Sequence, residues 1–146
     1  MGIIKDVTLT HMKIIAHEKG SIIKLIKSDQ NEFYGFGEAY LSSVNINETK
    51  DWRRHKEMYC NLVVIRGEVS FKLFDNRMTL NAKGSFMSIK LSRDKYVKLT
   101  IPPNIWFCFK GEKKENQILN ISNRIYDPNE VESLPLNNNN MPKVNW

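Results

Sequence analysis

The feature that most constrains the fold is a series of short runs in which apolar and polar residues alternate. Residues 69–74 read Val-Ser-Phe-Lys-Leu-Phe, and this period of two is typical of a strand with one buried face. No window of about eleven residues has the i, i+3, i+4, i+7 pattern of an amphipathic helix. Further candidate strands lie at residues 61–65, 85–91, 96–101, 105–109 and 117–122, with weaker ones at 7–9, 22–26 and 39–44. The sequence therefore predicts an all-β antiparallel sandwich or barrel over about residues 3–125, with little helix.

Two local features refine this prediction. The turn formers Arg66-Gly67-Glu68 separate two strand-like runs, so residues 61–65 and 69–74 are expected to pair as a hairpin. Residues 126–146 contain prolines and a run of asparagines, which predicts an irregular C-terminal strap that docks through Trp146. A disordered tail is the alternative. Since no linker divides the 146 residues, we expect residues 1–146 to form a single domain.

Composition narrows the classes of partner and location. The net charge of +6 favours an anionic partner, such as a phosphate, a nucleic acid or a membrane surface. No apolar run approaches the ~20 residues of a membrane span, and no secretory signal pattern precedes the first strand, so a cytoplasmic protein without a membrane partner is expected. Cys60 and Cys108 lie in apolar segments without CxxC spacing, which predicts buried free thiols in preference to a disulfide.

The basic segment at residues 50–56, Lys-Asp-Trp-Arg-Arg-His-Lys, is the richest in chemistry. An imidazole such as that of His55 can accept and return a proton near neutral pH. The neighbouring Arg53, Arg54 and Lys56 could hold a diphosphate beside it. From composition alone, a solvated basic turn with a surface histidine is the favoured alternative.

Other sites are poorly supported by the sequence. The chain has three histidines and no HxH or HxxxH pair, so we expect no metal site and no cofactor. It also lacks the GxSxG, GxxxxGK[ST] and GxGxxG patterns. Its aromatic residues mostly follow the apolar alternation, which does not favour nucleic-acid binding.

Short motifs, spread over nearly the whole chain, occur in the order and spacing of a known protein family. They are Ile4–Val7, Lys19-Gly20, Glu38-Ala39-Tyr40 leading to His55, the segment Leu62–Phe74 with Asp75-Asn76-Arg77 after it, Ile101-Pro102, and Tyr126-Asp127-Pro128 with Glu132. In this order and spacing the chain resembles the dTDP-4-dehydrorhamnose 3,5-epimerase family, whose fold is a cupin-type antiparallel β-barrel or jelly roll. The resemblance implies an epimerase or isomerase that acts on a nucleotide-linked 4-keto-6-deoxy sugar in deoxysugar or polysaccharide biosynthesis.

The resemblance also implies roles for single residues. His55 falls at the family's histidine and is the expected general base, and Tyr126 is the expected acid by motif, with Tyr40 and Tyr59 as competitors. Arg53 is among the expected contacts to a nucleotide-diphosphate sugar. The full set of expected substrate-binding residues is Lys19, Arg53, Arg54, Lys56 and Asn61. By the same resemblance we expect a homodimer.

Departures from the family pattern keep other functions open. Asn120 stands where the family has its catalytic tyrosine, and the segment that supplies an aspartate partner for the histidine is absent. The alternative function is therefore a non-catalytic cupin that binds a nucleotide sugar or regulates a partner. A basic β-domain that binds nucleic acid is a third possibility.

Overall fold

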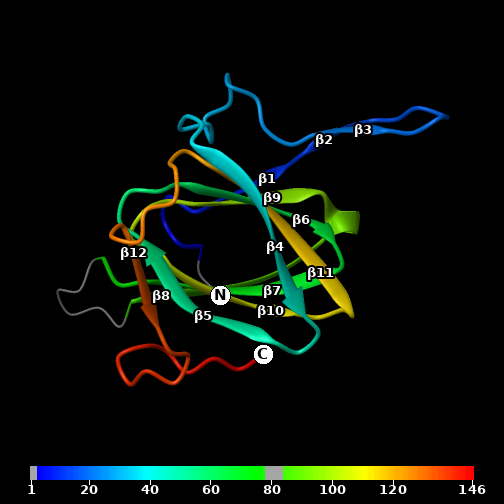
Figure 1. The fold of residues 1–146 in the computed structure, drawn as a ribbon. Helices are drawn as coiled ribbons and strands as arrows, with labels where there is room; N and C mark the ends of the chain where they lie inside the picture. The colour runs from blue at the N-terminus through cyan, green and yellow to red at the C-terminus, as the bar shows by residue number, and fades with distance from the viewer. Residues whose placement is uncertain (1–2, 78–83) are drawn as a thin grey trace.

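The computed structural model, which describes residues 3–77 and 84–146, has two five-stranded antiparallel sheets that face each other (Figure 1). The first sheet has the strand order β1-β9-β6-β11-β4 and the second β12-β5-β10-β7-β8. The strands of the first sheet are β1 (Thr8–His11), β9 (Val97–Ile101), β6 (Cys60–Arg66), β11 (Glu115–Ser122) and β4 (Glu38–Asn45). Those of the second are β12 (Val131–Leu134), β5 (Thr49–His55), β10 (Trp106–Gly111), β7 (Glu68–Asp75) and β8 (Ser85–Ser92). The one helical element among the described residues is the 3-10 turn η1 (Arg93–Lys95), so the all-β prediction is confirmed.

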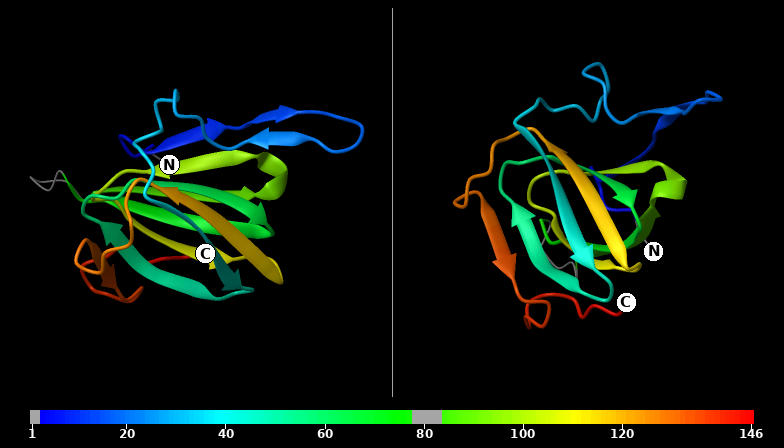
Figure 2. Two further views of the ribbon diagram at one scale, coloured as in Figure 1. Left: turned by 45° about the horizontal axis from the view of Figure 1, so that its top comes forward. Right: turned by 45° about the vertical axis from the view of Figure 1, so that its right-hand side comes forward.

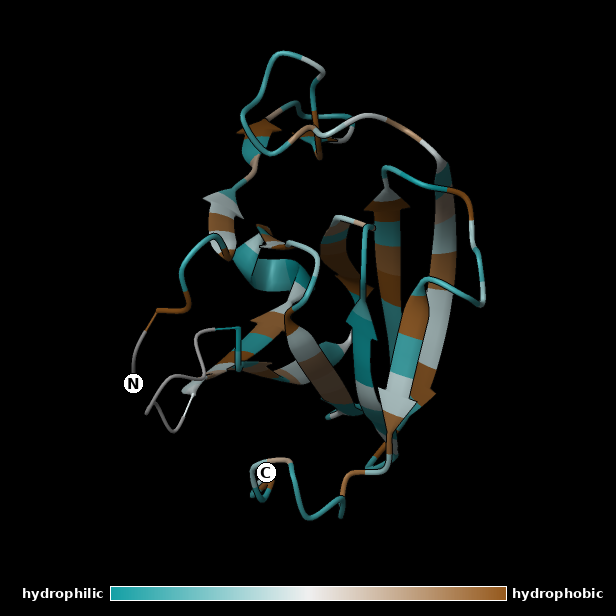
Figure 3. Cartoon of the chain, turned by 90° about the vertical axis from the view of Figure 1, so that its left-hand side faces the viewer, coloured by the Kyte–Doolittle hydropathy of each residue, from teal (hydrophilic) through white to brown (hydrophobic). Residues whose placement is uncertain are grey.

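The core lies between the two sheets because the inward residues of both are apolar. Figure 3 shows the strands banded by alternating apolar and polar residues. Phe71 and Leu73 on β7 are fully buried against Leu99 on β9 and Ile118 on β11. Burying each such side chain contributes about 1.5–3 kcal/mol, so these contacts hold the two sheets together.

The expected hairpin around Gly67 is wrong, since β6 and β7 belong to different sheets. β6 pairs with β9 and β11, whereas β7 pairs with β8 and β10. Gly67 adopts φ 74°, which turns the chain from one sheet into the other. The alternating runs on either side of Gly67 thus predicted both strands correctly, but they did not predict which strands pair with each of them.

The C-terminal segment differs from the expected irregular strap because it contains β12, which pairs with β5. After β12 the chain crosses the outer face of the second sheet. There Met141 is buried in an apolar cluster with Trp52 and Trp106. Trp146 is 40% exposed at the end of this crossing.

The free, buried thiols expected at Cys60 and Cys108 are confirmed. They lie on β6 and β10, in different sheets. Burial raises the pKa of each thiol to about 12, so both are unreactive near neutral pH.

A two-stranded arm leaves the body of the molecule. It consists of β2 (Lys13–Ile15) and β3 (Ile22–Lys24), and Figure 2 shows it extending beyond the two sheets. Ile14, Ile15 and Ile22 on this arm are exposed. Within residues 3–77 and 84–146, no helix has the length and apolar character needed to cross a membrane.

Candidate active site

The basic segment predicted from the sequence forms strand β5, which divides its side chains between two faces. Trp52 and Arg54 lie on the outer face, where the Arg54 guanidinium stacks 4.6 Å from the Trp106 ring centroid and pairs with Glu132 at 2.5 Å. Arg53 lines an interior cavity, and His55 lies on the same face of the strand. The basic segment is therefore a strand and not a solvated turn. Because side chains alternate along a strand, Arg53 and His55 lie on one face and Arg54 on the other.

The central feature of the site is a buried pair formed by His55 and Glu130, whose side chains are each 5% exposed. The His55 Nδ1 atom hydrogen-bonds Glu130 Oε1. The other oxygen, Oε2, accepts hydrogen bonds from the backbone N–H groups of Glu57 and Met58 at 3.2 and 3.3 Å. Glu130 therefore holds the imidazole ring in one orientation and leaves Nε2 as the free ring nitrogen.

The electrostatics of this pair favour a neutral imidazole. Burial lowers the pKa of His55 overall, although the hydrogen bond and the charge of Glu130 oppose this effect. Burial alone would raise the pKa of Glu130, but its contacts with His55 and the two backbone N–H groups lower it overall. With Glu130 ionised and accepting the Nδ1 proton, His55 Nε2 carries a lone pair that can accept a proton. His55 Nε2 is buried and has no hydrogen-bond partner among the described residues.

A cavity of about 400 Å³ lies beside this pair, between the inner faces of the two sheets. Arg53 and Phe107 connect the two features: both line the cavity, and the Phe107 ring centroid lies 6.2 Å from that of His55. The lining residues are Tyr40, Ser42, Lys50, Asp51, Arg53, Leu62, Phe107, Phe109, Ile118, Asn120 and Ser133. The cavity thus combines aromatic walls with two cations, one carboxylate, three hydroxyl groups and one amide.

The opposite wall of the cavity carries a hydrogen-bonded tyrosine. Asn120 on β11 lies directly across from Tyr40 on β4, and its Nδ2 donates to the Tyr40 hydroxyl at 2.9 Å. Since that hydroxyl accepts from Asn120, its own proton is available for another acceptor. Burial raises the pKa of Tyr40, so the phenol keeps its proton near neutral pH.

The structure places the remaining expected site residues outside this cavity. Lys19 lies in the turn of the projecting arm, and Lys56 is exposed with its ammonium 3.3 Å from the Asn129 carbonyl. Asn61 is buried, accepting from the Thr100 hydroxyl at 2.7 Å and donating to the Glu32 carbonyl at 3.2 Å. Tyr126 is 63% exposed in the segment before β12.

Sequence reasoning missed the carboxylate partner of His55. The family's aspartate segment is absent from this chain, but Glu130 supplies a carboxylate from the turn immediately before β12. Glu132, which belongs to the Tyr126-Asp127-Pro128 motif, pairs with Arg54 on the outer face. Across residues 3–77 and 84–146, no group of three or more His, Cys, Asp or Glu side chains is placed to hold a metal ion.

An antiparallel two-sheet barrel with an interior cavity is typical of the cupin class of small-molecule-binding proteins and enzymes. Residues 5–133 match the family model described as FdtA, WxcM-like, C-terminal. The chain belongs to this family.

Named relatives of the chain are sugar epimerases and isomerases. The probable low-salt glycan biosynthesis epimerase Agl13 of Haloferax volcanii is 24% identical over 127 residues, which are 85% of this chain and 81% of that protein. A dTDP sugar isomerase from Desulfovibrio desulfuricans G20 has a solved structure with a TM-score of 0.86 and 27% identity, covering 94% of this chain and 89% of that one. These matches confirm the resemblance to nucleotide-sugar epimerases that the sequence motifs indicated.

A third solved structure shares the fold at lower sequence identity. That protein is a mutant of the 3,4-ketoisomerase QdtA from Thermoanaerobacterium thermosaccharolyticum, solved in complex with TDP-4-keto-6-deoxyglucose. Its TM-score is 0.75 at 21% identity, and the match covers 89% of this chain and 88% of that one.

Proposed function

We propose that the protein is an epimerase or isomerase of a nucleotide-linked 4-keto-6-deoxy sugar. The observation that carries this proposal is the buried His55–Glu130 pair with its unpartnered Nε2, on the strand that also brings Arg53 to a cavity lined by Tyr40. The names of the relatives support the substrate class, since they include a dTDP sugar isomerase and a ketoisomerase solved with a 4-keto-6-deoxy sugar nucleotide.

The chemistry follows from the acidity of a C–H bond next to a ketone. His55 Nε2 takes a proton from a carbon adjacent to the C4 carbonyl, and the electron pair forms an enolate. Return of a proton to the opposite face of that carbon inverts the centre, whereas proton shifts through an enediol move the carbonyl to the neighbouring carbon. A positioned general base contributes about 10²–10⁴-fold to such a step.

The cations of the cavity suit the anionic part of the substrate. The Arg53 guanidinium and the Lys50 ammonium can bind the diphosphate or stabilise the enolate oxygen. Arg54 already pairs with Glu132 on the outer face, so we do not include it in the substrate contacts.

The structure favours Tyr40 over Tyr126 as the acid. Tyr40→Phe is expected to lower kcat about 10²-fold, because it removes the hydroxyl on the cavity wall. Tyr126→Phe, the matched control, is expected to change kcat less than about twofold, because Tyr126 is exposed outside the cavity. Steady-state kinetics of the two variants decide between them, and a large loss in Tyr126→Phe alone would restore the acid role to Tyr126.

We also propose a homodimer in which the projecting arms are covered by a second copy. An isolated two-stranded hairpin is marginally stable in water, and this one exposes Ile14, Ile15 and Ile22. A shallow apolar depression of about 220 Å³ at the arm's base, lined in part by Met12, Ile23 and Tyr96, could receive such side chains. Contact between copies at the arm could also bring Lys19 to a partner's surface.

Sedimentation velocity tests the dimer. The wild-type chain is expected to sediment as a dimer at micromolar concentration, and Ile22→Asp as a monomer because its carboxylate would be buried without a partner. Lys24→Asp, a neighbouring exposed position on the same strand, serves as the control for adding an acidic residue. A monomeric wild type would contradict the proposed dimer.

The function itself is tested by offering the protein several 4-keto-6-deoxy nucleotide sugars and following the sugar ring by NMR. An epimerase gives an inverted ring carbon, and a ketoisomerase gives a 3-keto sugar. Binding of these compounds without conversion would instead support the non-catalytic cupin alternative.

A further inference from the structure

The outer face of the second sheet carries a cluster of lysines that the proposed reaction does not use. Ser70 on β7 lies directly between Lys90 on β8 and Lys110 on β10. Lys72, two residues further along β7, points to the same outer face. Adjacent strands lie about 4.8 Å apart, so the register brings these three lysines to one patch around Ser70, where the Lys72 ammonium donates to the Ser88 hydroxyl at 2.8 Å.

The segment after β12 runs over the outer face to this cluster. It covers the apolar part of the face, where Phe74 and Trp106 are buried, and its last residue reaches the lysines. The Trp146 ring centroid lies 5.7 Å from the Lys72 ammonium, and Trp146 is 40% exposed. Trp146 and the lysines line a groove of about 380 Å³, which we call the lysine groove. Its lining residues are Ser70, Phe71, Lys72, Ser88, Ile89, Lys90, Lys110, Glu112 and Trp146.

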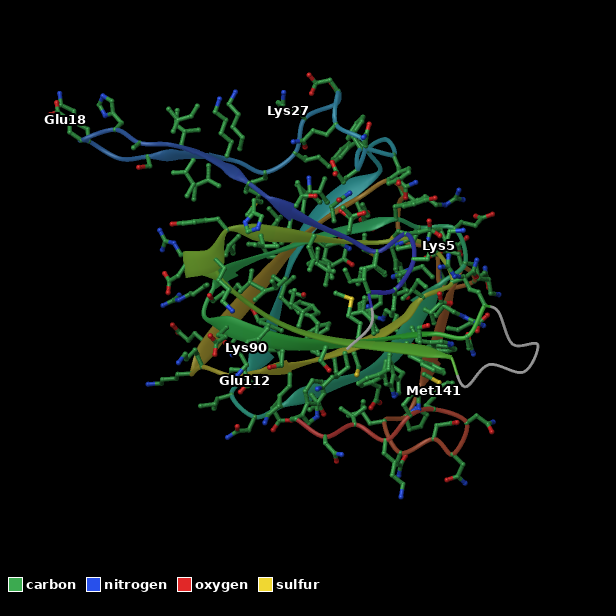
Figure 4. The ribbon with its side chains drawn as sticks, turned by 180° about the vertical axis from the view of Figure 1, so that it is seen from behind. Lys5, Glu18, Lys27, Lys90, Glu112 and Met141 are labelled. Carbon is green, nitrogen blue, oxygen red and sulfur yellow. The ribbon has the colours of Figure 1, made fainter. Side chains whose placement is uncertain are left out.

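Positive charge in the lysine groove is only partly compensated. Glu112 accepts a hydrogen bond from the Ser70 hydroxyl at 2.6 Å, and Glu68 lies 3.9 Å from the Lys90 ammonium. Figure 4 shows Lys90 and Glu112 side by side at this end of the sheet. In the described part of the chain, neither Lys72 nor Lys110 has a carboxylate within ion-pair distance. The groove therefore keeps an excess of positive charge beside an exposed aromatic ring.

We infer that the lysine groove is a second ligand site that binds a phosphate-bearing molecule, with Trp146 stacking on a nucleobase when the ligand is a nucleotide. Lysine ammonium groups are suitable donors to phosphate oxygens. An exposed indole ring offers a stacking surface that tolerates any base. The site is separate from the proposed catalytic cavity because it lies on the opposite face of strands β7 and β10, so it does not depend on the proposed function.

The test is an NMR titration of the full chain that follows the indole N–H signal of Trp146. The buried Trp52 and Trp106 indoles are internal references, and the probes are thymidine monophosphate, inorganic phosphate and thymidine. A saturable shift of the Trp146 signal is expected with both phosphate-bearing probes and not with thymidine. Tighter binding of the monophosphate than of phosphate identifies a nucleotide site, and equal affinity identifies a site for phosphate alone.

Charge variants make the test specific. Lys110→Gln is expected to weaken binding about tenfold, as for loss of a charge-assisted hydrogen bond, and Glu112→Gln to strengthen it several-fold by removing the opposing carboxylate. Lys13→Gln on the distant arm makes the same charge change and is expected to leave the affinity unaltered. The inference is overturned if the Trp146 signal does not saturate, if thymidine binds as well as its monophosphate, or if Lys110→Gln and Lys13→Gln behave alike.

Discussion

Replacing His55 by asparagine is expected to lower the rate of proton exchange at the substrate carbon about 10²–10⁴-fold. Asparagine keeps a polar side chain that Glu130 can contact, but it has no lone-pair nitrogen in place of the buried Nε2. The loss should appear in kcat more than in KM, because His55 is proposed to act on the reacting proton, whereas the proposed contacts to the diphosphate are Arg53 and Lys50.

The control for this variant is His11→Asn. His11 ends β1 on the exposed edge of the first sheet, outside the cavity, and its replacement is expected to leave the rate unchanged. Circular dichroism and the thermal midpoint establish that both variants fold. A folded His55→Asn variant that retains the wild-type exchange rate would remove His55 from the mechanism.

Replacing Glu130 by glutamine is expected to have an effect of similar size, about 10²–10⁴-fold in kcat, as for loss of the orienting carboxylate in a histidine pair. The amide preserves shape but removes the negative charge that holds the Nδ1 proton and stabilises the imidazolium formed on proton transfer. Glu132→Gln is the matched control: Glu132 is a half-buried carboxylate two residues away that pairs with Arg54 on the outer face, and the variant is expected to stay close to wild type.

The pH profile separates this role of Glu130 from a merely structural one. The hydrogen bond and charge of Glu130 raise the pKa of His55, against the larger effect of burial, which lowers it. Without that charge the pKa of His55 falls further, so the acid limb of kcat/KM in Glu130→Gln should move to lower pH. An acid limb at the wild-type position, with activity reduced, would indicate that Glu130 acts through folding alone.

The sequence predicted most strands because their alternation is local. Residues 85–91 and 117–122 became β8 and β11 with small changes at their ends. The strand at residues 49–55 was missed, since its mostly polar residues hide the two faces of a strand that buries Trp52 on the outside and His55 on the inside. Strand partners were not predictable from a turn, and the hairpin assigned around Gly67 was wrong for that reason.

In the candidate site, too, features of the local sequence were predictable and contacts between distant segments were not. His55 could be singled out from its neighbours and from family motifs, whereas its partner Glu130 lies 75 residues away and depends on the pairing of β12 with β5. Tyr40 could not be preferred over Tyr126 because only the register of β4 with β11 brings Tyr40 to Asn120 and the cavity.

Deuterium incorporation in heavy water tests the central claim most directly. Wild-type protein and the His55→Asn variant are incubated with TDP-4-keto-6-deoxyglucose, and the ring protons next to the carbonyl are followed by NMR. The proposed mechanism predicts that wild type replaces a proton at one of these carbons with deuterium and that His55→Asn does so no faster than buffer. Tight binding of the sugar nucleotide by wild type with no exchange at either carbon would contradict it.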